Sequence, residues 1–278
     1  MNKILMTGAS SYVGARIYFD LKDKYDIVGT YFNNPLSKSF IKLNLTDKEA
    51  VKKIFKDIKP EIVIHIANFP SPKNAVNNEK NYIALNDKAT QYLVENANNV
   101  GVKVIFTSSL AAENPDNIYG KLKLKSEGII KGIKNGYLIL RPSMIVGFSP
   151  NTANDRPFNR ILRCLDDKTK IAQFDTSWKL QPTYVGHLSQ VIDKVIQNNT
   201  WNKTIPVFID EIVSQYQIAY DILSQFDVVV NPIDLKRDIP PSNDDLSYFL
   251  SLNLAPKSYK EMINVIVEEI KNRGKFKL

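Results

Sequence analysis

Short apolar runs alternate with amphipathic stretches along the first half of this 278-residue chain, and that alternation leaves few folds open. The runs expected to form strands cover residues 4–6, 25–31, 61–67, 102–107 and 138–142. The stretches expected to form helices cover residues 48–58, 86–98 and 119–133. Because the runs are almost continuously apolar, they are typical of parallel strands that are buried on both faces. The pattern predicts an α/β fold with a doubly wound parallel sheet.

The N-terminal sequence KILMTGASSYVGARIYFDL predicts a strand, a tight glycine turn and a helix. Glycines let such a turn approach a pyrophosphate, which then rests on backbone N–H groups at the positive end of the helix. Ser11 stands where a G-x-x-G-x-x-G loop has its middle glycine, so the loop must tolerate a Cβ there or use the hydroxyl as a donor. An ordinary βα turn is the alternative for this segment taken alone. The residues expected to contact a dinucleotide in this Rossmann-like loop are Gly8, Ser10, Ser11, Tyr12, Val13 and Gly14.

Tyr119 and Lys123, in the segment NIYGKLKLKSE, lie four residues apart in an expected helix and therefore share one face. An ammonium beside a phenol favours the phenolate, so Lys123 would make Tyr119 a stronger acid. Such a tyrosine can exchange a proton with a carbonyl or an alcohol while a nicotinamide exchanges hydride. A surface pair without chemistry is the alternative, because tyrosine, lysine and helices are all common.

Together these motifs resemble the extended short-chain dehydrogenase/reductase superfamily, and within it the dTDP-4-dehydrorhamnose reductase branch. The matching segments include the cofactor loop TGASSYVG, the strand IVIHIAN, the serine strand FTSS and the helix YGKLKLKSE. LNLTD resembles the segment beside the adenine, although Asn44 stands where an aspartate is usual. LRPSMIVG, QPTYVGHLSQVI, VSQYQIAYDIL and PSNDDLSYFLSLNLAPKSYKEMI follow in the expected order, so the likeness covers nearly the whole chain.

The resemblance implies that Ser109, Tyr119 and Lys123 are catalytic residues. Lys123 would bind the nicotinamide ribose, Tyr119 would protonate a ketone oxygen, and Ser109 would position that oxygen. Ser108 is the alternative for Ser109, because both follow the same strand at its carboxyl end. The connection at residues 110–118 is shorter than is usual in the family, which predicts a more open or reshaped substrate site. Besides the loop residues, the implied cofactor contacts are Asn44, Leu45, Ala67, Asn68, Thr107, Tyr119, Lys123 and Pro142.

The choice of cofactor depends on the end of the second expected strand. NAD-binding folds of this kind place an acid there for the ribose hydroxyls, whereas residues 30–35 contain none. The missing acid favours NADP(H) over NAD(H), with Arg16 or Lys38 available to attract the 2′-phosphate. The alternative is that Asn33 binds an unphosphorylated ribose.

The expected dinucleotide-binding domain covers residues 1–148, with residues 183–198 returning to it. Residues 149–278 would form mainly a smaller C-terminal substrate-binding lobe, which includes Phe158–Leu165, Thr204–Asp210 and the C-terminal helix. Tyr184, Trp178 and Arg156 are candidates for contacts with a base, sugar or diphosphate. For the aromatic residues, a place in the core of the lobe is the alternative.

The resemblance implies an NAD(P)-dependent oxidoreductase that reduces the 4-keto group of a nucleotide sugar. An epimerase or dehydratase of the same superfamily is one alternative; Leu110, Ala111 and Ala112 follow Ser109 where a dehydratase would place acids. A non-catalytic NADP-binding regulatory subunit is the other, because the branch also resembles the regulatory subunit of methionine adenosyltransferase. An intact Ser–Tyr–Lys set favours an enzyme.

Composition narrows the other classes. The net charge is +8, but lysines alternate with acids along the expected helices, which predicts a solvated surface and no nucleic-acid partner. The single cysteine, Cys164, excludes an intrachain disulfide. No apolar run approaches a membrane span and no leader is evident, so the expected location is cytoplasmic, without a membrane partner. His65 and His187 are expected to be structural, no metal site is expected, and the sequence leaves the oligomeric state open, with a homodimer as one option.

Overall fold

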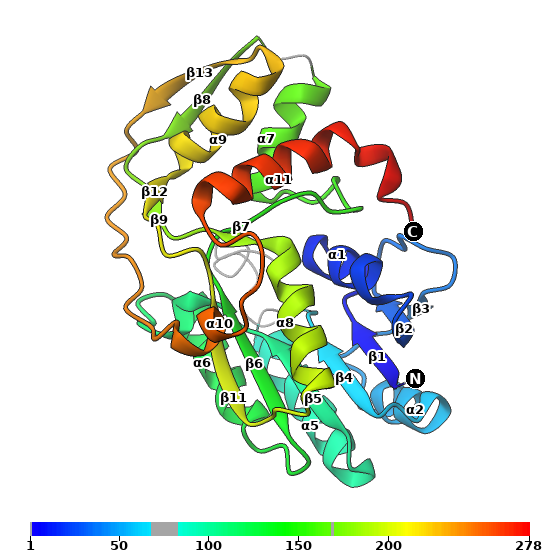
Figure 1. Cartoon of the computed structure of the whole chain (residues 1–278). Coiled ribbons are helices and arrows are strands. Elements are labelled where there is room, and N and C mark those ends of the chain that lie inside the picture. The colour runs from blue at the N-terminus through cyan, green and yellow to red at the C-terminus, as the bar shows by residue number, and fades with distance from the viewer. Residues whose placement is uncertain (1, 68–82, 168–169) are drawn as a thin grey trace.

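The computed structural model describes residues 2–67, 83–167 and 170–278, and within them lies a seven-stranded sheet in which every strand pair is parallel (Figure 1). The strand order is β11–β6–β5–β4–β1–β2–β3, formed by β1 (Lys3–Thr7), β2 (Asp26–Tyr31), β3 (Ile41–Lys42), β4 (Ile62–His65), β5 (Lys103–Thr107), β6 (Tyr137–Pro142) and β11 (Lys203–Val207). The order 3-2-1-4-5-6 is that of a doubly wound nucleotide-binding sheet. The predicted α/β fold is confirmed.

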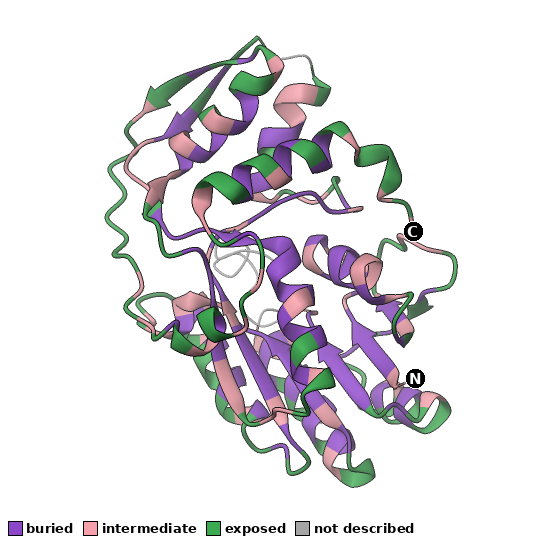
Figure 2. Cartoon of the chain, in the orientation of Figure 1, coloured by how far each residue is buried: buried purple, intermediate pink, exposed green. Residues whose placement is uncertain are grey.

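Helices cover both faces of this sheet. The helices α1 (Tyr12–Leu21) and α8 (Val185–Gln197) share an apolar core with one face. On the other face lie α2 (Lys48–Ile58), α5 (Ala89–Val100), which follows the π-helical turn η1 (Ala84–Lys88), and α6 (Ile118–Ile130). Successive side chains of β1 alternate between the two cores, with Ile4 and Met6 in the first and Leu5 in the second. Figure 2 shows the result, with buried strands and helices that are exposed on their outer sides.

A third apolar core lies in the C-terminal lobe. Figure 1 shows the elements of this lobe beyond the carboxyl ends of the main strands. The core is formed by α7 (Pro157–Asp166), α9 (Gln215–Leu223) and α11 (Tyr259–Lys271) with β8 (Ile171–Asp175) and β13 (Val229–Ile233). Short strands complete this lobe, namely β7 (Ile145–Val146), β9 (Lys179–Leu180), β10 (Thr183–Tyr184) and β12 (Val213–Ser214). The remaining elements of the described residues are the helix α10 (Ser247–Ser251) and the 3-10 turns η2 (Leu110–Ala112), η3 (Ser224–Phe226) and η4 (Arg273–Lys275).

One predicted segment lies elsewhere. Thr204–Asp210 is expected in the C-terminal lobe, and this expectation is wrong for most of the segment because β11 is the edge strand of the main sheet. It pairs with β6 from Lys203 opposite Leu138 to Val207 opposite Pro142. Its apolar residues continue the core under α8, so burial on the sheet decides its position. Residues 183–198 form β10 and α8, and α8 packs against α1.

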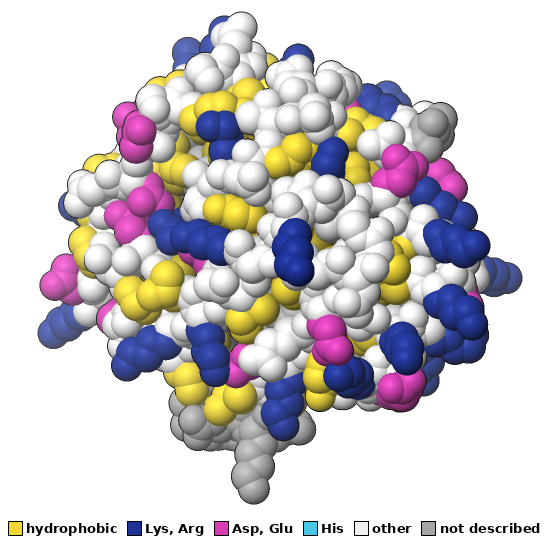
Figure 3. All heavy atoms as spheres, turned by 90° about the horizontal axis from the view of Figure 1, so that it is seen from below, with side chains coloured by type: hydrophobic (Ala, Val, Ile, Leu, Met, Phe, Trp, Pro, Cys, Tyr) yellow, Lys and Arg dark blue, Asp and Glu magenta, His cyan; other side chains and the backbone are white. Residues whose placement is uncertain are grey.

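Figure 3 shows one face of the molecule, on which lysine and arginine side chains lie among acidic, polar and apolar groups, with several of them next to one another at the right-hand edge. This distribution agrees with the interleaving of charges in the sequence. In residues 2–67, 83–167 and 170–278, every helix falls short of the length and hydropathy that a bilayer crossing requires.

Candidate active site

The turn after β1 needs its two glycines because of close backbone approaches. Gly8 has a φ of +74°, and a Cβ on it would lie 2.8 Å from the nitrogen of Ala67, two residues after β4. A Cβ on Gly14 would lie 2.1 Å from the Gly8 carbonyl oxygen. The start of α1 therefore packs directly on the turn, and the backbone N–H groups of the first helical turn have no partner within the helix. This arrangement can bind a phosphate group.

Ser11 fits this loop without a glycine. Its Oγ accepts a hydrogen bond of 3.0 Å from the Gly14 N–H and thereby caps α1. Since Oγ is an acceptor in that bond, its own hydrogen can still be donated to an anion. Ser10 Oγ accepts from the Leu36 N–H at 3.1 Å, which ties the loop after β2 to the glycine turn.

The same loop is fastened to the C-terminal lobe. Ser149 Oγ donates to the Tyr12 carbonyl oxygen at 2.6 Å, and Asn151 Nδ2 donates to the Ser10 carbonyl oxygen at 2.5 Å. The Tyr12 hydroxyl donates to the Gly147 carbonyl oxygen at 2.5 Å, and burial raises the pKa of this phenol. The Tyr12 side chain therefore packs between the glycine turn and the C-terminal lobe. A cofactor contact at this residue, as predicted, would be made by its backbone.

Arg16 does not bind a 2′-phosphate in this arrangement, which corrects the sequence-based expectation. Its side chain is buried, forming a 2.8 Å ion pair with Glu269 and a 2.9 Å ion pair with Asp20. Its Nη1 also donates to the Phe148 carbonyl oxygen at 2.7 Å. The Arg16 side chain is only 7% exposed, so little of the guanidinium is accessible to a ligand. Lys38, the other predicted cation, is exposed in the loop after β2.

The remaining predicted cofactor contacts differ in exposure. Asn44 is exposed, and its Oδ1 accepts from the Thr46 N–H and hydroxyl at 3.1 and 2.8 Å. Leu45 and Pro142 are buried, Val13 and Ala67 are half-buried, and Asn68 lies outside the described residues. Thr107, at the end of β5, is buried, and its Oγ1 has no hydrogen-bond partner in the described part of the chain.

Lys123 lies inside the protein, on the helix that also carries Tyr119. It is only 3% exposed, and its Nζ donates to the Thr107 carbonyl oxygen at 2.8 Å and lies 4.7 Å from the centre of the Phe106 ring. Burial lowers the pKa of Lys123 to about 7; the charge of Arg156 acts in the same direction, and Glu127 opposes both. The lysine is therefore a desolvated cation at the carboxyl end of β5.

The two serines after β5 have different surroundings. Ser108 is buried, and its hydroxyl donates to Glu127 Oε1 at 2.6 Å. Ser109 is half-buried, and its Oγ accepts from the Ala111 N–H at 3.3 Å, so its own hydrogen can be donated to a ligand. This geometry favours Ser109 over Ser108 as the residue that meets a substrate.

Gly120 brings the serine segment and the tyrosine helix together. A Cβ on Gly120 would lie 2.3 Å from the Ala111 carbonyl oxygen in η2. Asn117 caps α6 through a 3.0 Å bond from the Gly120 N–H to its Oδ1. Because the helix begins directly against η2, the short connection at residues 110–118 still places Tyr119 beside the segment that carries Ser109.

Both histidines, for which structural roles are expected from the sequence, are buried. His65 Nδ1 lies 2.8 Å from Thr7 Oγ1, and burial together with the charge of Lys123 lowers the pKa of His65 to about 3. His187 packs between Tyr184 and Phe249, and burial lowers its pKa to about 4. With pKa values this low, both imidazoles are neutral at working pH and are poor proton donors.

The three residues predicted to contact a substrate in the lobe have different surroundings. Tyr184 is buried and donates to Glu269 Oε1 at 2.5 Å, so it belongs to the lobe interface. Trp178 packs on the lobe core, with the Arg237 guanidinium 4.8 Å from its ring centre. Arg156, half-buried just before α7, is the one of the three whose charge influences Lys123.

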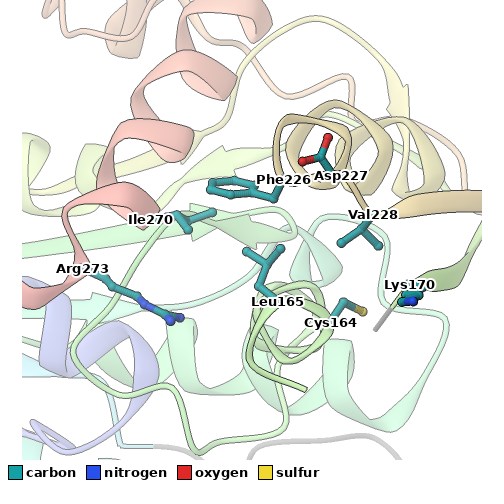
Figure 4. Close-up of a pocket in the computed structure, with 8 residues that line it drawn as sticks. All are labelled: Cys164, Leu165, Lys170, Phe226, Asp227, Val228, Ile270 and Arg273. Carbon is teal, nitrogen blue, oxygen red and sulfur yellow. The ribbon is translucent and has the colours of Figure 1, made fainter. Parts of the chain in front are cut away.

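A cavity of about 420 Å³ lies in the lobe, away from these residues (Figure 4). It is lined by Cys164, Leu165, Lys170, Phe226, Asp227, Val228, Ile270 and Arg273. None of the predicted catalytic or cofactor residues lines it. Among the described residues, no group of three His, Cys, Asp or Glu side chains is placed to bind a metal ion.

The fold defines the class of protein. A parallel sheet of this order, opened by a glycine turn and extended by a C-terminal lobe, is the fold seen in solved structures of a dTDP-4-dehydrorhamnose reductase and a UDP-glucose 4-epimerase. The family model described as the RmlD substrate binding domain matches residues 1–243. The chain belongs to this family, and the predicted resemblance to the dTDP-4-dehydrorhamnose reductase branch is confirmed.

Similar proteins include both enzymes and a subunit of another enzyme. The beta subunit of methionine adenosyltransferase 2 from Xenopus tropicalis is 27% identical over 203 residues, which cover 68% of this chain and 60% of that protein. The NADP complex of dTDP-4-dehydrorhamnose reductase from Bacillus anthracis has a TM-score of 0.79 at 22% identity and covers 97% of this chain and 99% of that one. UDP-glucose 4-epimerase from Thermotoga maritima, solved with UDP-glucose, has a TM-score of 0.80 at 19% identity, covering 98% and 99%. At these identities the two structures show a common fold.

Proposed function

We propose that the protein is an NAD(P)-dependent oxidoreductase that reduces the keto group of a nucleotide sugar, with Ser109, Tyr119 and Lys123 as its catalytic residues. The observation that carries this proposal is the burial of Lys123, whose ammonium donates to the Thr107 carbonyl oxygen at 2.8 Å. A buried cation with neutral partners is expensive for the fold. Such a cation is useful where it binds a ribose and where it stabilises the phenolate of a tyrosine that donates a proton.

The residues present fit a nicotinamide dinucleotide. The glycine turn offers backbone that a Cβ would obstruct, and Thr107 Oγ1 is a buried hydroxyl without a partner in the described residues. The turn and the first residues of α1 would bind the pyrophosphate, while Asn44, Leu45 and Pro142 would flank the cofactor. A bound nicotinamide supplies the hydride. NADP(H) is favoured over NAD(H), because residues 30–35 contain no acid and Lys38 is exposed nearby.

The chain's own residues supply the proton chemistry. Tyr119 donates its phenolic proton to the carbonyl oxygen, which becomes the hydroxyl of the product. Ser109 donates a hydrogen bond to the same oxygen and orients the substrate. Lys123, while charged, stabilises the phenolate that Tyr119 leaves behind.

A regulatory subunit is the second candidate, and one observation favours it. The relative with 27% identity is the beta subunit of methionine adenosyltransferase 2, a part of a larger enzyme. In that case the dinucleotide site would serve to stabilise the chain or its complex, and turnover would be absent.

The deciding experiment is a titration of the purified protein with NADPH and with NADH, followed by oxidation assays with a panel of 4-keto nucleotide sugars. Tight binding of NADPH with turnover of one sugar supports the reductase. Binding without turnover of any sugar supports the regulatory subunit. Failure to bind either nucleotide would overturn both candidates.

A further inference from the structure

A buried carboxylate lies beneath the proposed catalytic residues and has no part in the chemistry described above. Glu127 is 0% exposed, and it lies on α6 one turn after Lys123 and two turns after Tyr119. The three side chains therefore share one face of the helix. A fully buried carboxylate is destabilising unless its oxygens accept hydrogen bonds or pair with a cation. The partners of Glu127 therefore indicate its role.

Glu127 joins the two strands that end at the site. Ser108 Oγ, at the end of β5, donates to its Oε1 at 2.6 Å. Arg141, on β6, donates to Oε1 from Nε at 2.9 Å and to Oε2 from Nη2 at 2.8 Å. Arg141 also contacts Asp244 at 3.3 Å, in the segment that leads from the lobe to α10. One carboxylate thus connects the helix of Tyr119 to Ser108, the first residue after β5.

The same carboxylate contributes to the charge balance around Lys123. Arg156, in the segment before α7, disfavours the ammonium, and Glu127 favours it. His65, on β4, is neutral at working pH, and the Thr107 carbonyl on β5 is an uncharged acceptor. Tyr119 lies on the same helix as Lys123 and Glu127. Removal of the charge on Glu127 leaves the effect of Arg156 on the cation without the opposing effect of this carboxylate.

We propose that Glu127 is a positioning residue of the reaction. It binds Ser108 and thereby fixes Ser109 against the helix of Tyr119, and it supports the charged form of Lys123. This inference rests on the proposed oxidoreductase function. A purely structural ion pair would stabilise the fold without setting the pH dependence of turnover.

The test uses Glu127→Gln and Glu127→Asp in the full-length protein. The amide of Glu127→Gln can still accept from Ser108, but it lacks the charge and one oxygen that Arg141 binds. We expect kcat at pH 7.5 to fall about 10- to 100-fold, because small displacements of reacting groups have effects of this size. The NADPH Kd should change much less than kcat, since the glycine turn that would bind the pyrophosphate is formed by other elements. The limb of the kcat–pH profile that reports loss of the Lys123 charge should move to lower pH. Glu127→Asp, which keeps the charge but shortens the side chain, should restore the position of that limb while kcat stays below that of the wild type.

Asp193→Asn is the matched control. Asp193 is a buried carboxylate on α8, on the opposite face of the sheet, and it accepts from the Tyr25 hydroxyl at 2.7 Å. Its replacement should lower the thermal stability without moving kcat or the pH profile. Wild-type kcat and an unshifted profile in Glu127→Gln, or an effect confined to stability as in Asp193→Asn, would overturn the inference alone. Absence of turnover in the wild-type protein would overturn the proposed function and this inference with it.

Discussion

Lys123 is the residue at which stability and the proposed chemistry conflict. Its pKa is lowered from 10.5 to about 7 by burial and by Arg156, so the folded chain releases its proton before the unfolded chain does. Between those two values the unfolded state binds more protons, and this group makes stability rise with pH. Below about pH 7 the cation is present in both states and the full cost of burying it is felt. The wild-type protein should therefore gain stability from this group as the pH rises from 7 to 10.

The substitution Lys123→Met should abolish both this rise in stability with pH and turnover. We expect the variant to be more stable than the wild type at pH 6 by about 1 kcal/mol or more, because a buried unpaired charge is lost. The difference should shrink as the pH rises toward 10. Urea unfolding of both proteins at pH 6, 8 and 10 measures it. A difference independent of pH would show that Lys123 is not a desolvated cation in the folded protein.

Tyr119→Phe separates proton transfer from binding. The variant lacks only the phenolic oxygen, so the proposed chemistry loses its acid while the shape of the helix is kept. We expect kcat to fall by at least about 100-fold, the usual range for a general acid, and the NADPH Kd to stay within about threefold. Steady-state kinetics and nucleotide titration give the two values. Unchanged turnover would rule out Tyr119 as the proton donor.

At the scale of elements, the contact between α6 and η2 determines whether Ser109 and Tyr119 lie together. The Cβ of Gly120→Ala would lie 2.3 Å from the Ala111 carbonyl oxygen, so the helix and the turn must separate. We expect a loss of stability of about 1–3 kcal/mol and a fall in kcat of about 100-fold. Gly128→Ala, on the same helix and with no atom within 4 Å of the new Cβ, should instead be neutral or stabilising by up to about 1 kcal/mol. Similar effects from the two substitutions would contradict this account of the packing.

The elements that the sequence predicts well are those whose own pattern is sufficient. The strands β1, β2, β4, β5 and β6 and the helices α2, α5 and α6 lie where the apolar runs and amphipathic stretches predict them, because burial on two faces or one produces those periodicities. β3 has two residues, both exposed, so it has no apolar pattern to detect. β11 follows α8 after the chain has left the sheet, and only its pairing with β6 reveals its place.

Residue roles were harder to predict where they depend on partners distant in sequence. In the sequence, three side chains look equally available for ligands, namely those of Ser11, Ser108 and Arg16. The structure separates them through Gly14, Glu127 and Glu269, and two of these partners lie far along the chain. Glu127 itself could have been found from its spacing, because it lies four residues after Lys123 on the same helical face.

At the scale of the whole molecule, a buried ion pair joins α1 to α11. Arg16 on α1 binds Glu269 on α11 at 2.8 Å and donates to the Tyr184 hydroxyl at 2.9 Å. Glu269 also accepts from the Phe148 N–H at 3.0 Å. The apolar core of the lobe includes Tyr12 from the first turn of α1. We therefore expect the sheet and the lobe to unfold in one cooperative transition.

Breaking this pair from one side should destabilise both parts at once. Glu269→Gln removes the charge that faces Arg16, and the loss in free energy of unfolding should be about 3 kcal/mol. Arg16→Met should have a comparable effect, because it leaves the Glu269 carboxylate buried without its cation. The double variant Arg16→Met/Glu269→Met should lose less than the sum of the single variants, since no unpaired charge remains. Urea unfolding followed by circular dichroism and by the fluorescence of Trp178 in the lobe and Trp201 beside the sheet measures both the energies and the cooperativity. Additive losses, or separate transitions for the two probes in the wild-type protein, would show that the ion pair does not couple the lobe to the sheet.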